Sequence, residues 1–238
     1  MKIGIIALTR MSSSRLPGKA LKDIGGRPLL GRVIDRLRCA ATDLDCTLIV
    51  ATSEEPEDDA IAEFCRSEIV KTYRGSLHDV AGRALSAATH SGLDYFIRIS
   101  ADSPFMSPDV IGLAASIVRS EEPDLTTNIF PRTYPPGVSV EVIKTDTFKK
   151  LLEKPTTKDE REHVTKAFYN RPQGFKIINF TAPEGNLSAI KLTVDTPDDL
   201  KKSRWIYDKL GQHSTTAPLS RIIGLAREYD LISKSHVA

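Results

Sequence analysis

The sequence lacks the features that mark several broad classes of protein. Its three cysteines form no Cys-x-x-Cys pair, so we expect free thiols in a reducing compartment rather than a disulfide framework. No apolar run approaches the length of a membrane span, and the first residues lack the charged and apolar regions of a secretory signal peptide. We therefore expect a cytoplasmic protein that does not enter a membrane.

The chain also lacks an excess of charge of either sign. Its 33 Lys and Arg residues are nearly balanced by 31 Asp and Glu residues, which gives a formal net charge of +2. Because nucleic-acid-binding domains usually show a strong basic excess, we expect no nucleic-acid partner. There is no fixed-period repeat, and 238 residues with 40% hydrophobic content are consistent with one α/β domain over residues 1–238.

A cationic loop follows the first apolar run. Residues 3–8 are apolar and rich in isoleucine, which predicts a strand buried on both faces of a parallel sheet. Arg10, Arg15 and Lys19 then follow, separated by three serines that include Ser13. Guanidinium, ammonium and hydroxyl groups all bind phosphate oxygens, so this loop is suited to an anion. We expect these cations to be catalytic residues.

Two common nucleotide-binding motifs are absent from this loop. It contains neither Gly-x-x-x-x-Gly-Lys-Ser/Thr nor Gly-x-Gly-x-x-Gly, which argues against a P-loop and against a dinucleotide fold. A plain basic surface loop between a strand and a helix is the alternative. The position after a buried strand favours a ligand site, because open α/β sheets bind ligands at the carboxyl ends of their strands.

Two aspartates are predicted at the same edge of the sheet. Asp102 follows a strand expected at 94–100, and Asp195 follows one expected at 190–194. Each precedes a helix opened by Ser/Thr-Pro-Asp, which already supplies its own capping residues. Neighbouring strand ends would let both carboxylates share one Mg²⁺. The alternative is that both are ordinary acids near helix N-termini.

Other elements are predicted from pattern alone. Further strands are expected at 46–51, 69–73, 124–130, 138–142 and 175–180. A helix is expected from Pro28 to about Cys39, and another from Asp159 to just before Pro172. The last two helices, at 200–210 and 219–229, are amphipathic and are expected to pack on the sheet.

The cationic loop resembles a family motif. Its sequence, Arg10-Met-Ser-Ser-Ser-Arg-Leu-Pro-Gly-Lys19, is similar to the Arg-x-x-Ser-x-Arg-Leu-Pro-Gly-Lys loop of the sugar-acid cytidylyltransferases, which activate sialic acids and deoxy-octulosonate. The match is nearest to the spore-coat polysaccharide biosynthesis protein F branch. In this sequence, Leu8 and Thr9 replace the Gln-Ala of that branch, and Ser12 replaces its glycine.

Further stretches share the resemblance. They are Arg74-Gly-Ser-x-x-Asp-Val, Asp102-Ser-Pro-Phe-Met-Ser-Pro, Glu160-Arg-Glu-His-Val-Thr and Val194-Asp-Thr-Pro-Asp-Asp-Leu. The resemblance implies a nucleotide-diphosphosugar transferase fold, of GT-A-like Rossmann type: a mostly parallel, twisted sheet with helices on both faces. It implies CTP and a small sugar-acid-like acceptor as partners, Mg²⁺ on Asp102 and Asp195, and a homodimer formed around 130–142.

The resemblance also implies contacts with the nucleotide. The implied nucleotide-binding residues are Leu8, Arg10, Ser13, Arg15, Lys19, Thr52, Ser53, Arg74, Asp79 and Arg83. For some of them a helix-capping role is the alternative: Thr52 and Ser53 precede a predicted helix, and Ser76 with Asp79 has the spacing of a capping box.

The sequence allows two roles each for Glu141 and His163. Glu141 is implied as an acceptor contact, while its place in the alternating run 138–142 favours a solvent-facing strand residue. His163 belongs to the family-like string 160–165 and is equally explained as a partly buried helix residue. One histidine beside one glutamate does not make a metal site, because metal ligands converge from several positions.

The predicted function is transfer of CMP from CTP to a sugar acid or related acceptor, with release of pyrophosphate, in surface polysaccharide or glycoconjugate biosynthesis. A nucleotidyltransferase for a sugar phosphate or alcohol phosphate would keep the same fold. A non-catalytic nucleotide-binding protein would keep the phosphate loop. The paired aspartates argue against that last interpretation, because binding alone rarely needs two placed carboxylates.

Overall fold

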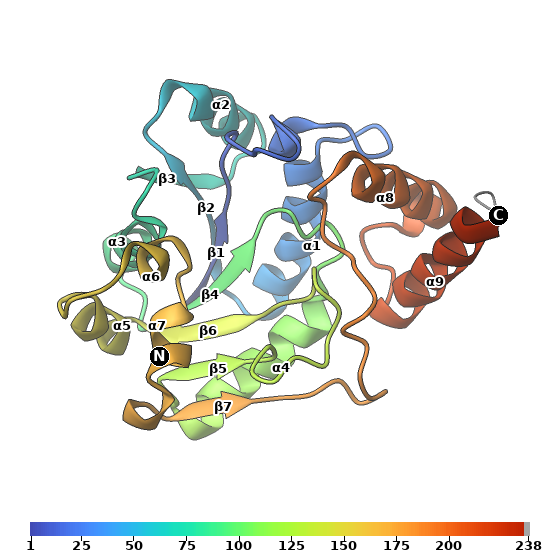
Figure 1. Cartoon of the computed structure of the whole chain (residues 1–238). Helices are drawn as coiled ribbons and strands as arrows, with labels where there is room; N and C mark the ends of the chain where they lie inside the picture. Colours follow the sequence, from blue (N-terminus) through green and yellow to red (C-terminus); the bar gives the residue numbers. More distant parts are fainter. Residues whose placement is uncertain (236–238) are drawn as a thin grey trace.

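The structure is a computed structural model that describes residues 1–235. Within that range, the strands form one seven-stranded sheet in the order β3-β2-β1-β4-β6-β5-β7 (Figure 1). The pairs among β1 to β4 are parallel, and β6 runs antiparallel to both of its neighbours, so the prediction of a mostly parallel sheet is confirmed. The strands are β1 (Ile3–Leu8), β2 (Thr47–Ser53), β3 (Lys71–Gly75), β4 (Tyr95–Ser100), β5 (Leu125–Thr127), β6 (Glu141–Lys144) and β7 (Ile177–Asn179).

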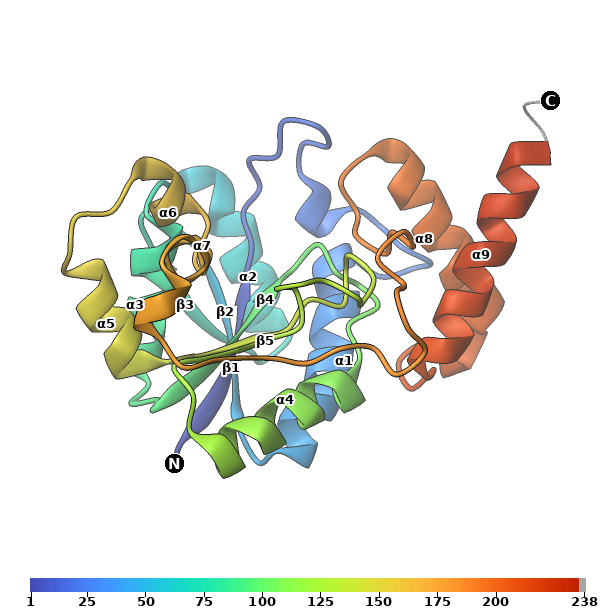
Figure 2. The ribbon, with the colours of Figure 1, turned by 60° about the horizontal axis from the view of Figure 1, so that its bottom comes forward.

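Helices cover both faces of the sheet. One face carries α1, α2 and α4, and the other carries α3, α5 and α7, with α6 above α3 (Figures 1 and 2). No helix within residues 1–235 is long and apolar enough to cross a membrane. The helices are α1 (Leu29–Asp43), α2 (Asp59–Ser67), α3 (Val80–His90), α4 (Pro108–Glu121), α5 (Thr145–Leu152), α6 (Lys158–Glu162), α7 (Lys166–Asn170), α8 (Pro197–Leu210) and α9 (Leu219–Ser235).

Strand β1 is buried along its whole length, as its isoleucine-rich sequence predicts. Ile5 and Ala7 enter the core on the α1 side, while Ile6 and Leu8 enter the core on the α3 side. Leu8 pairs with Ser100, so β1 and β4 end at the same level, while β2 continues past its pair with Leu8 at Ala51 to Ser53. After β1 the chain continues to β2 on one side of this strand pair, and after β4 it continues to β5 on the other side. This divergence creates a crevice at the carboxyl ends of β1 and β4.

Some predicted elements differ from the structure. The expected strand at 190–194 is wrong, because Leu192 N–H bonds to the Pro136 carbonyl and Val194 N–H to the Asp102 carbonyl, which are single contacts to loops rather than a ladder. The helix expected from Asp159 is interrupted between α6 and α7. The expected strand at 138–142 begins only at Glu141, and the one at 124–130 ends at Thr127.

The predicted excursion at 130–142 packs on the body of the protein. Tyr134, Val138 and Val140 are buried in the core on the α1 side, and Phe130 remains exposed. A homodimer through this segment stays a prediction.

The last two helices pack on each other beyond the edge of the α1 layer, where Arg32 of α1 lies over the ring of Tyr207 of α8 (Figures 1 and 2). The expectation that they pack on the sheet is wrong for this reason. Arg36 of α1 is buried there and donates hydrogen bonds to the carbonyls of Met106, Ser214, Thr215 and Ala217. These bonds satisfy a buried charge that apolar contacts alone could not accommodate.

Candidate active site

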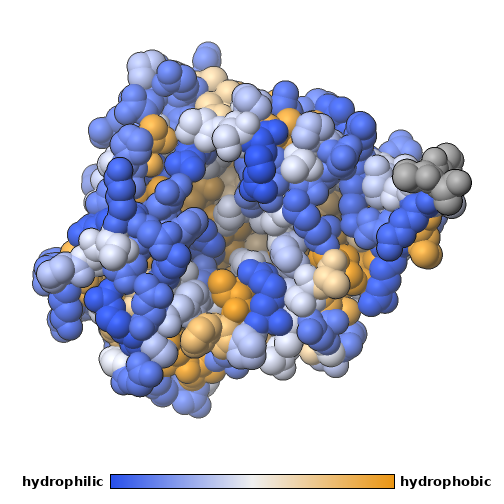
Figure 3. All heavy atoms as spheres, viewed as in Figure 1, coloured by the Kyte–Doolittle hydropathy of each residue, from blue (hydrophilic) through white to orange (hydrophobic). Residues whose placement is uncertain are grey.

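A cleft of about 400 Å³ opens where β1 and β4 end. It appears as a hollow in the middle of the face shown in Figure 3. The loop after β1 forms one wall, and α3 with the α6–α7 junction forms the other. The lining residues are Leu8, Thr9, Arg10, Ser12, Ser13, Ser14, Arg15, Lys19, Ala20, Val80, Arg83, Arg98, Ser100, Ala101, Asp102, Glu162, His163 and Asp195.

The loop after β1 is held in place by backbone contacts. Gly18 N–H bonds to the Met11 carbonyl at 3.1 Å and closes the loop. Gly18 has a φ of 68°, a left-handed conformation that glycine adopts without steric cost. Leu16 is buried and anchors the loop in the core. The cations and serines of the loop therefore line the cleft together, as the sequence predicts.

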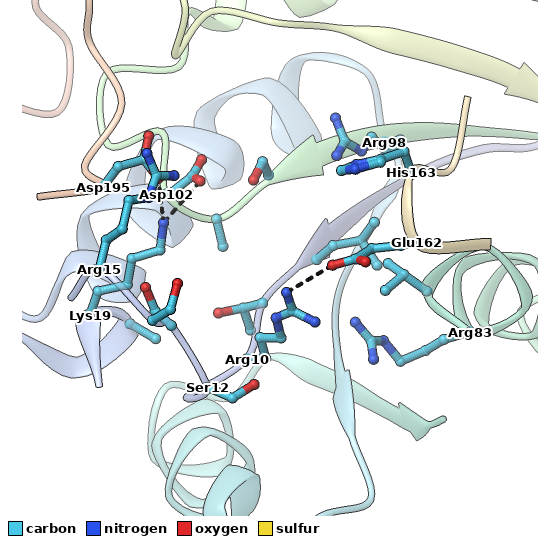
Figure 4. Close-up of a pocket in the computed structure, with 18 residues that line it drawn as sticks. Arg10, Ser12, Arg15, Lys19, Arg83, Arg98, Asp102, Glu162, His163 and Asp195 are labelled. Carbon is cyan, nitrogen blue, oxygen red and sulfur yellow. Dashed lines mark hydrogen bonds and ion pairs between the residues drawn. The ribbon is translucent and has the colours of Figure 1, made fainter. Parts of the chain in front are cut away.

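Lys19 joins the two predicted metal ligands. Its ammonium group lies 3.1 Å from an Asp102 carboxylate oxygen, 3.0 Å from an Asp195 carboxylate oxygen and 2.9 Å from the Val194 carbonyl oxygen (Figure 4). All three ammonium hydrogens thus have an acceptor. Because both carboxylate oxygens lie at these distances from the same nitrogen, they are at most about 6.1 Å apart. The structure therefore brings Asp102 and Asp195 together, although it holds them with a lysine.

Backbone pairing explains why two aspartates so far apart in sequence meet. Val194 N–H bonds to the Asp102 carbonyl at 2.8 Å, which places the segment before Asp195 beside the end of β4. Thr196 and Asp199 form the capping box of α8, so Asp195 is not needed at that helix end. The alternative that Asp195 merely serves the N-terminus of α8 is accordingly weakened.

Positive charge keeps Asp195 ionised. Burial by itself raises the pKa of this carboxyl, but the hydrogen bond and charge of Lys19, with Arg15 and Lys191, outweigh it and hold the pKa below its usual value. Arg15 lies 3.2 Å from the same carboxylate oxygen that Lys19 contacts. Asp195 is therefore a permanent anion at neutral pH, available to a cation.

A second group of charged residues lies across the cleft from this cluster (Figure 4). Arg10 pairs with Glu162 at 3.2 Å. Arg83 is almost fully buried, donates to the Ser76 carbonyl at 2.6 Å, and has a pKa lowered by that burial. Its Nε finds no partner within the described residues 1–235. Arg10 and Arg83 thus reach the cleft as predicted, and Glu162 was not predicted.

Thr52 and Ser53 do not reach the cleft. Both are fully buried, and their hydroxyls donate to Asp58 at 2.9 and 2.5 Å. Asp58 also accepts from the Ser53 and Met11 backbone N–H groups at 2.9 and 2.6 Å. These residues lock the ends of β1 and β2 together and leave no free hydroxyl for a nucleotide. The sequence analysis did not identify Asp58 as the partner of these hydroxyls.

Arg74 and Asp79 also lie outside the cleft lining. Arg74 donates to the Ser53 carbonyl at 2.8 Å and pairs with Asp59 at 2.6 Å. Asp79 is itself the N-cap of α3, accepting from Gly82 N–H at 2.8 Å, and pairs with Arg161 at 3.1 Å. The capping alternative for Asp79 is confirmed, although the N-cap is Asp79 rather than the expected Ser76. Nucleotide contacts by these two residues stay predictions.

Glu141 is buried, so the expectation of a solvent-facing residue is wrong. It accepts from Arg98 at 3.1 Å and from the Tyr169 hydroxyl at 2.5 Å, and it does not line the cleft. Arg98 does line the cleft and was missed. A charged residue inside the apolar strand at 95–99 was the signal that could have identified it.

His163 lines the cleft with its side chain 62% exposed, at the break between α6 and α7. The interpretation as a partly buried helix residue is therefore wrong. No cluster of three or more His, Cys, Asp or Glu residues suited to a metal exists within the described part of the chain.

Comparison with known proteins identifies the family. The family model described as cytidylyltransferase matches residues 3–214. This chain belongs to the cytidylyltransferase family. The match includes the cationic loop, both cleft aspartates and α8, so the conserved domain of the family contains the entire cleft described above.

Individual cytidylyltransferases and their relatives support this assignment. The spore coat polysaccharide biosynthesis protein SpsF of Bacillus subtilis is 28% identical over 94% of each chain. The 3-deoxy-manno-octulosonate cytidylyltransferase of Chlorobium phaeobacteroides is 37% identical over 55% of this chain and 52% of its own length. A solved cytidylyltransferase structure from Leptospira borgpetersenii superposes with a TM-score of 0.90 at 26% identity, covering 98% of this chain and 96% of that one. The predicted fold and nucleotidyltransferase activity are confirmed.

Proposed function

We propose that this cytidylyltransferase transfers CMP from CTP to a sugar acid or a related small acceptor and releases pyrophosphate. The observation that carries the proposal is the meeting of Lys19 with Asp102 and Asp195 at the strand ends. One cluster thus combines cations for phosphates with a carboxylate pair for a metal. The similarity to SpsF supports a place in surface polysaccharide or glycoconjugate biosynthesis.

The cationic loop would hold the triphosphate. Arg10, Arg15 and Lys19 all line the cleft and supply two guanidinium groups and an ammonium group to phosphate oxygens. An acceptor hydroxyl would attack the α-phosphorus in line and lose its proton to solvent, forming a new P–O bond while the bond to the β-phosphate oxygen breaks. Pyrophosphate leaves with the electron pair of that bond. Catalysis would come from positioning and from neutralising the developing charge.

Asp102 and Asp195 would hold Mg²⁺. Their oxygens lie within about 6.1 Å of one another and already converge on one cation, the Lys19 ammonium group. Hard carboxylate oxygens fit Mg²⁺, which in nucleotide sites is bound by one or two carboxylates together with phosphates and waters. When bound, Mg²⁺ would offset charge on the reacting phosphate and on the leaving pyrophosphate. Ser103 and Thr193 donate hydrogen bonds to the other oxygens of this pair and would orient it.

A screen for pyrophosphate release tests the proposal. CTP, UTP, ATP and GTP would each be incubated with Mg²⁺ and with a panel of sugar acids, sugar phosphates and alcohol phosphates. We expect release with CTP and at least one sugar acid. Release that requires a sugar phosphate or an alcohol phosphate would redirect the acceptor class, and preference for a purine nucleotide would contradict the proposal.

A further inference from the structure

Arg98 is a charged residue in the apolar strand β4, between Ile97 and Ile99. Its side chain reaches the cleft and is 23% exposed. Figure 4 shows it beside His163, on the other side of the cleft from Lys19, Asp102 and Asp195. Arg15 and Lys19, which meet Asp195, therefore lie apart from Arg98, and the reaction described above gives Arg98 no role.

Buried groups behind Arg98 fix its orientation. Glu141, only 1% exposed, accepts from Arg98 Nη1 at 3.1 Å. The other Glu141 oxygen accepts from the Tyr169 hydroxyl, which also lies 2.8 Å from the Thr127 hydroxyl. Burial and the charge of Glu141 raise the pKa of Tyr169, so the phenol stays a neutral donor. Glu141 is too enclosed to meet a ligand itself, and its evident role is to position Arg98.

Glu141 is the only hydrogen-bonding partner of the Arg98 guanidinium group within the described residues 1–235. The nearby Arg132 does not line the cleft and donates instead to the Ser139 hydroxyl at 2.9 Å. In addition, the Nε of Arg98 is buried and has no hydrogen-bond partner in this part of the chain.

A buried N–H donor without an acceptor is costly and rare. Arg98 donates to Glu141 through Nη1 alone within the described residues, and its partly exposed side chain lines the cleft. The exposed part of the guanidinium group can therefore meet the planar, two-oxygen face of a carboxylate or phosphate. We propose that Arg98 binds an anionic group of the acceptor and so selects charged acceptors over neutral sugars. This inference rests on the proposed function, because it assumes that the nucleotide phosphates occupy the Lys19 side.

Nuclear magnetic resonance of the Arg98 side chain tests the inference directly. The Nε–Hε signal would be assigned in protein labelled with ¹⁵N-arginine, by its loss in Arg98→Lys. With CTP present, we expect sodium glucuronate to shift this signal saturably, while the neutral glucuronamide leaves it unchanged. Glucose 6-phosphate and neutral glucose form the second pair of ligands. The anion that saturates the shift at the lower concentration shows whether Arg98 prefers a carboxylate or a phosphate. The signal of the exposed Arg119 serves as the control for ionic strength.

Two results would overturn the inference: no shift with either anion, or equal shifts with glucuronamide and glucuronate. Neither result would affect the proposed function, which the pyrophosphate screen decides without reference to Arg98. Conversely, if anions shift the Arg98 signal but the protein releases no pyrophosphate, the anion site is supported and the proposed reaction is contradicted.

Kinetics with an acceptor from the screen separate binding from structure. Arg98→Gln should raise the KM for the acceptor on the order of 10-fold or more and leave the KM for CTP within about twofold. That variant leaves the buried Glu141 carboxylate without its ion-pair partner. The double variant Arg98→Gln/Glu141→Gln is the control for this, because both members of the pair are then neutral. Equal acceptor KM in the double variant and the wild type would overturn the inference. Glu141→Gln alone should raise the acceptor KM less, since it keeps a hydrogen-bond acceptor for Arg98.

Discussion

The loops that follow β1 and β2 leave the same edge of the sheet, yet they use their polar side chains in opposite ways. After β1, Arg15 and Lys19 line the cleft; both meet the acid before α8, and Lys19 also meets the acid in the loop after β4. At the end of β2, Thr52 and Ser53 are buried and donate their hydroxyls to Asp58 of the loop that follows. The first loop lines the cleft, whereas the polar groups at the end of β2 are satisfied within their own loop.

The difference lies in the distance at which each polar group finds its partner. Asp58 is five or six residues along the chain from the hydroxyls that donate to it, and it is the residue immediately before α2. The partners of Lys19 are 83 and 176 positions away. A polar group at a strand end is thus a good site candidate when no local partner can satisfy it. The predictions below test this contrast between an open loop and a closed one.

The largest effect is expected from the carboxylates of the open side. Asp102→Asn and Asp195→Asn should each reduce Mg²⁺-dependent turnover to the background of the assay, because a neutral amide is a far weaker ligand for Mg²⁺. Pyrophosphate release from CTP measures this. Asp198→Asn, an exposed acid in the first turn of α8, is the matched control and should keep its activity. Equal activity in Asp195→Asn and Asp198→Asn would show that Asp195 serves only the helix.

A loss on the order of 100-fold in turnover is expected for Lys19→Met, since it removes a preorganised electrostatic contact with phosphate. Steady-state kinetics with CTP would measure it, and Lys22→Met, three residues along and outside the cleft lining, is the control. In the same variant, Mn²⁺ alone should bind more tightly than to the wild type, because the ammonium group no longer occupies the space between the carboxylates. Normal turnover at unchanged melting temperature would refute the role of Lys19.

A stability effect, rather than a catalytic one, is expected from the closed loop. Asp58→Asn should lower the free energy of unfolding by about 2 kcal/mol, because buried donors lose a charged acceptor. Burial raises the pKa of Asp58, but hydrogen bonds from Ser53, Met11 and Thr52 outweigh it and depress the pKa. A depressed folded-state pKa gives stability that is present above the unfolded value of about 3.9 and is lost as the pH falls through the folded value. Urea unfolding from pH 7 to pH 3 should therefore show the two proteins converging at acidic pH.

The smallest effect is expected from Thr52→Val. It removes one hydroxyl donor to Asp58 and should cost about 1 kcal/mol of stability, with CTP affinity unchanged. Isothermal titration with CTP separates the two accounts of Thr52. A severalfold loss of CTP affinity without a loss of stability would restore its predicted contact with the nucleotide.

Much of the framework could be predicted from the sequence. The isoleucine-rich run at 3–8 could only be a buried central strand, and the loop ending at Lys19 had no local partner for its charges. The pairing of Asp102 with Asp195 followed from the rule that parallel strand ends share an edge. It was correct although residues 190–194 form no strand, because one hydrogen bond from Val194 to Asp102 has the same effect on position.

Other features depended on tertiary contacts that a local pattern does not contain. Glu141 alternates like a solvent-facing residue, but Tyr169 from α7 and Arg98 from β4 enclose it. Asp58 has the composition of a helix first turn, and its burial depends on the loop after β1 passing over it. Side chains whose partners come from several elements could not be assigned before the fold was known.

The fate of the α-phosphorus of CTP tests the central claim most directly. The protein would be incubated with Mg²⁺, with the acceptor found by the screen, and with CTP labelled with ³²P at the α-position or, separately, at the γ-position. We predict that the α-label moves to a new product in which CMP is joined to the acceptor, while the γ-label appears in pyrophosphate. Recovery of the γ-label in inorganic phosphate or on the acceptor, with the α-label left in CDP, would show a different reaction and contradict the account.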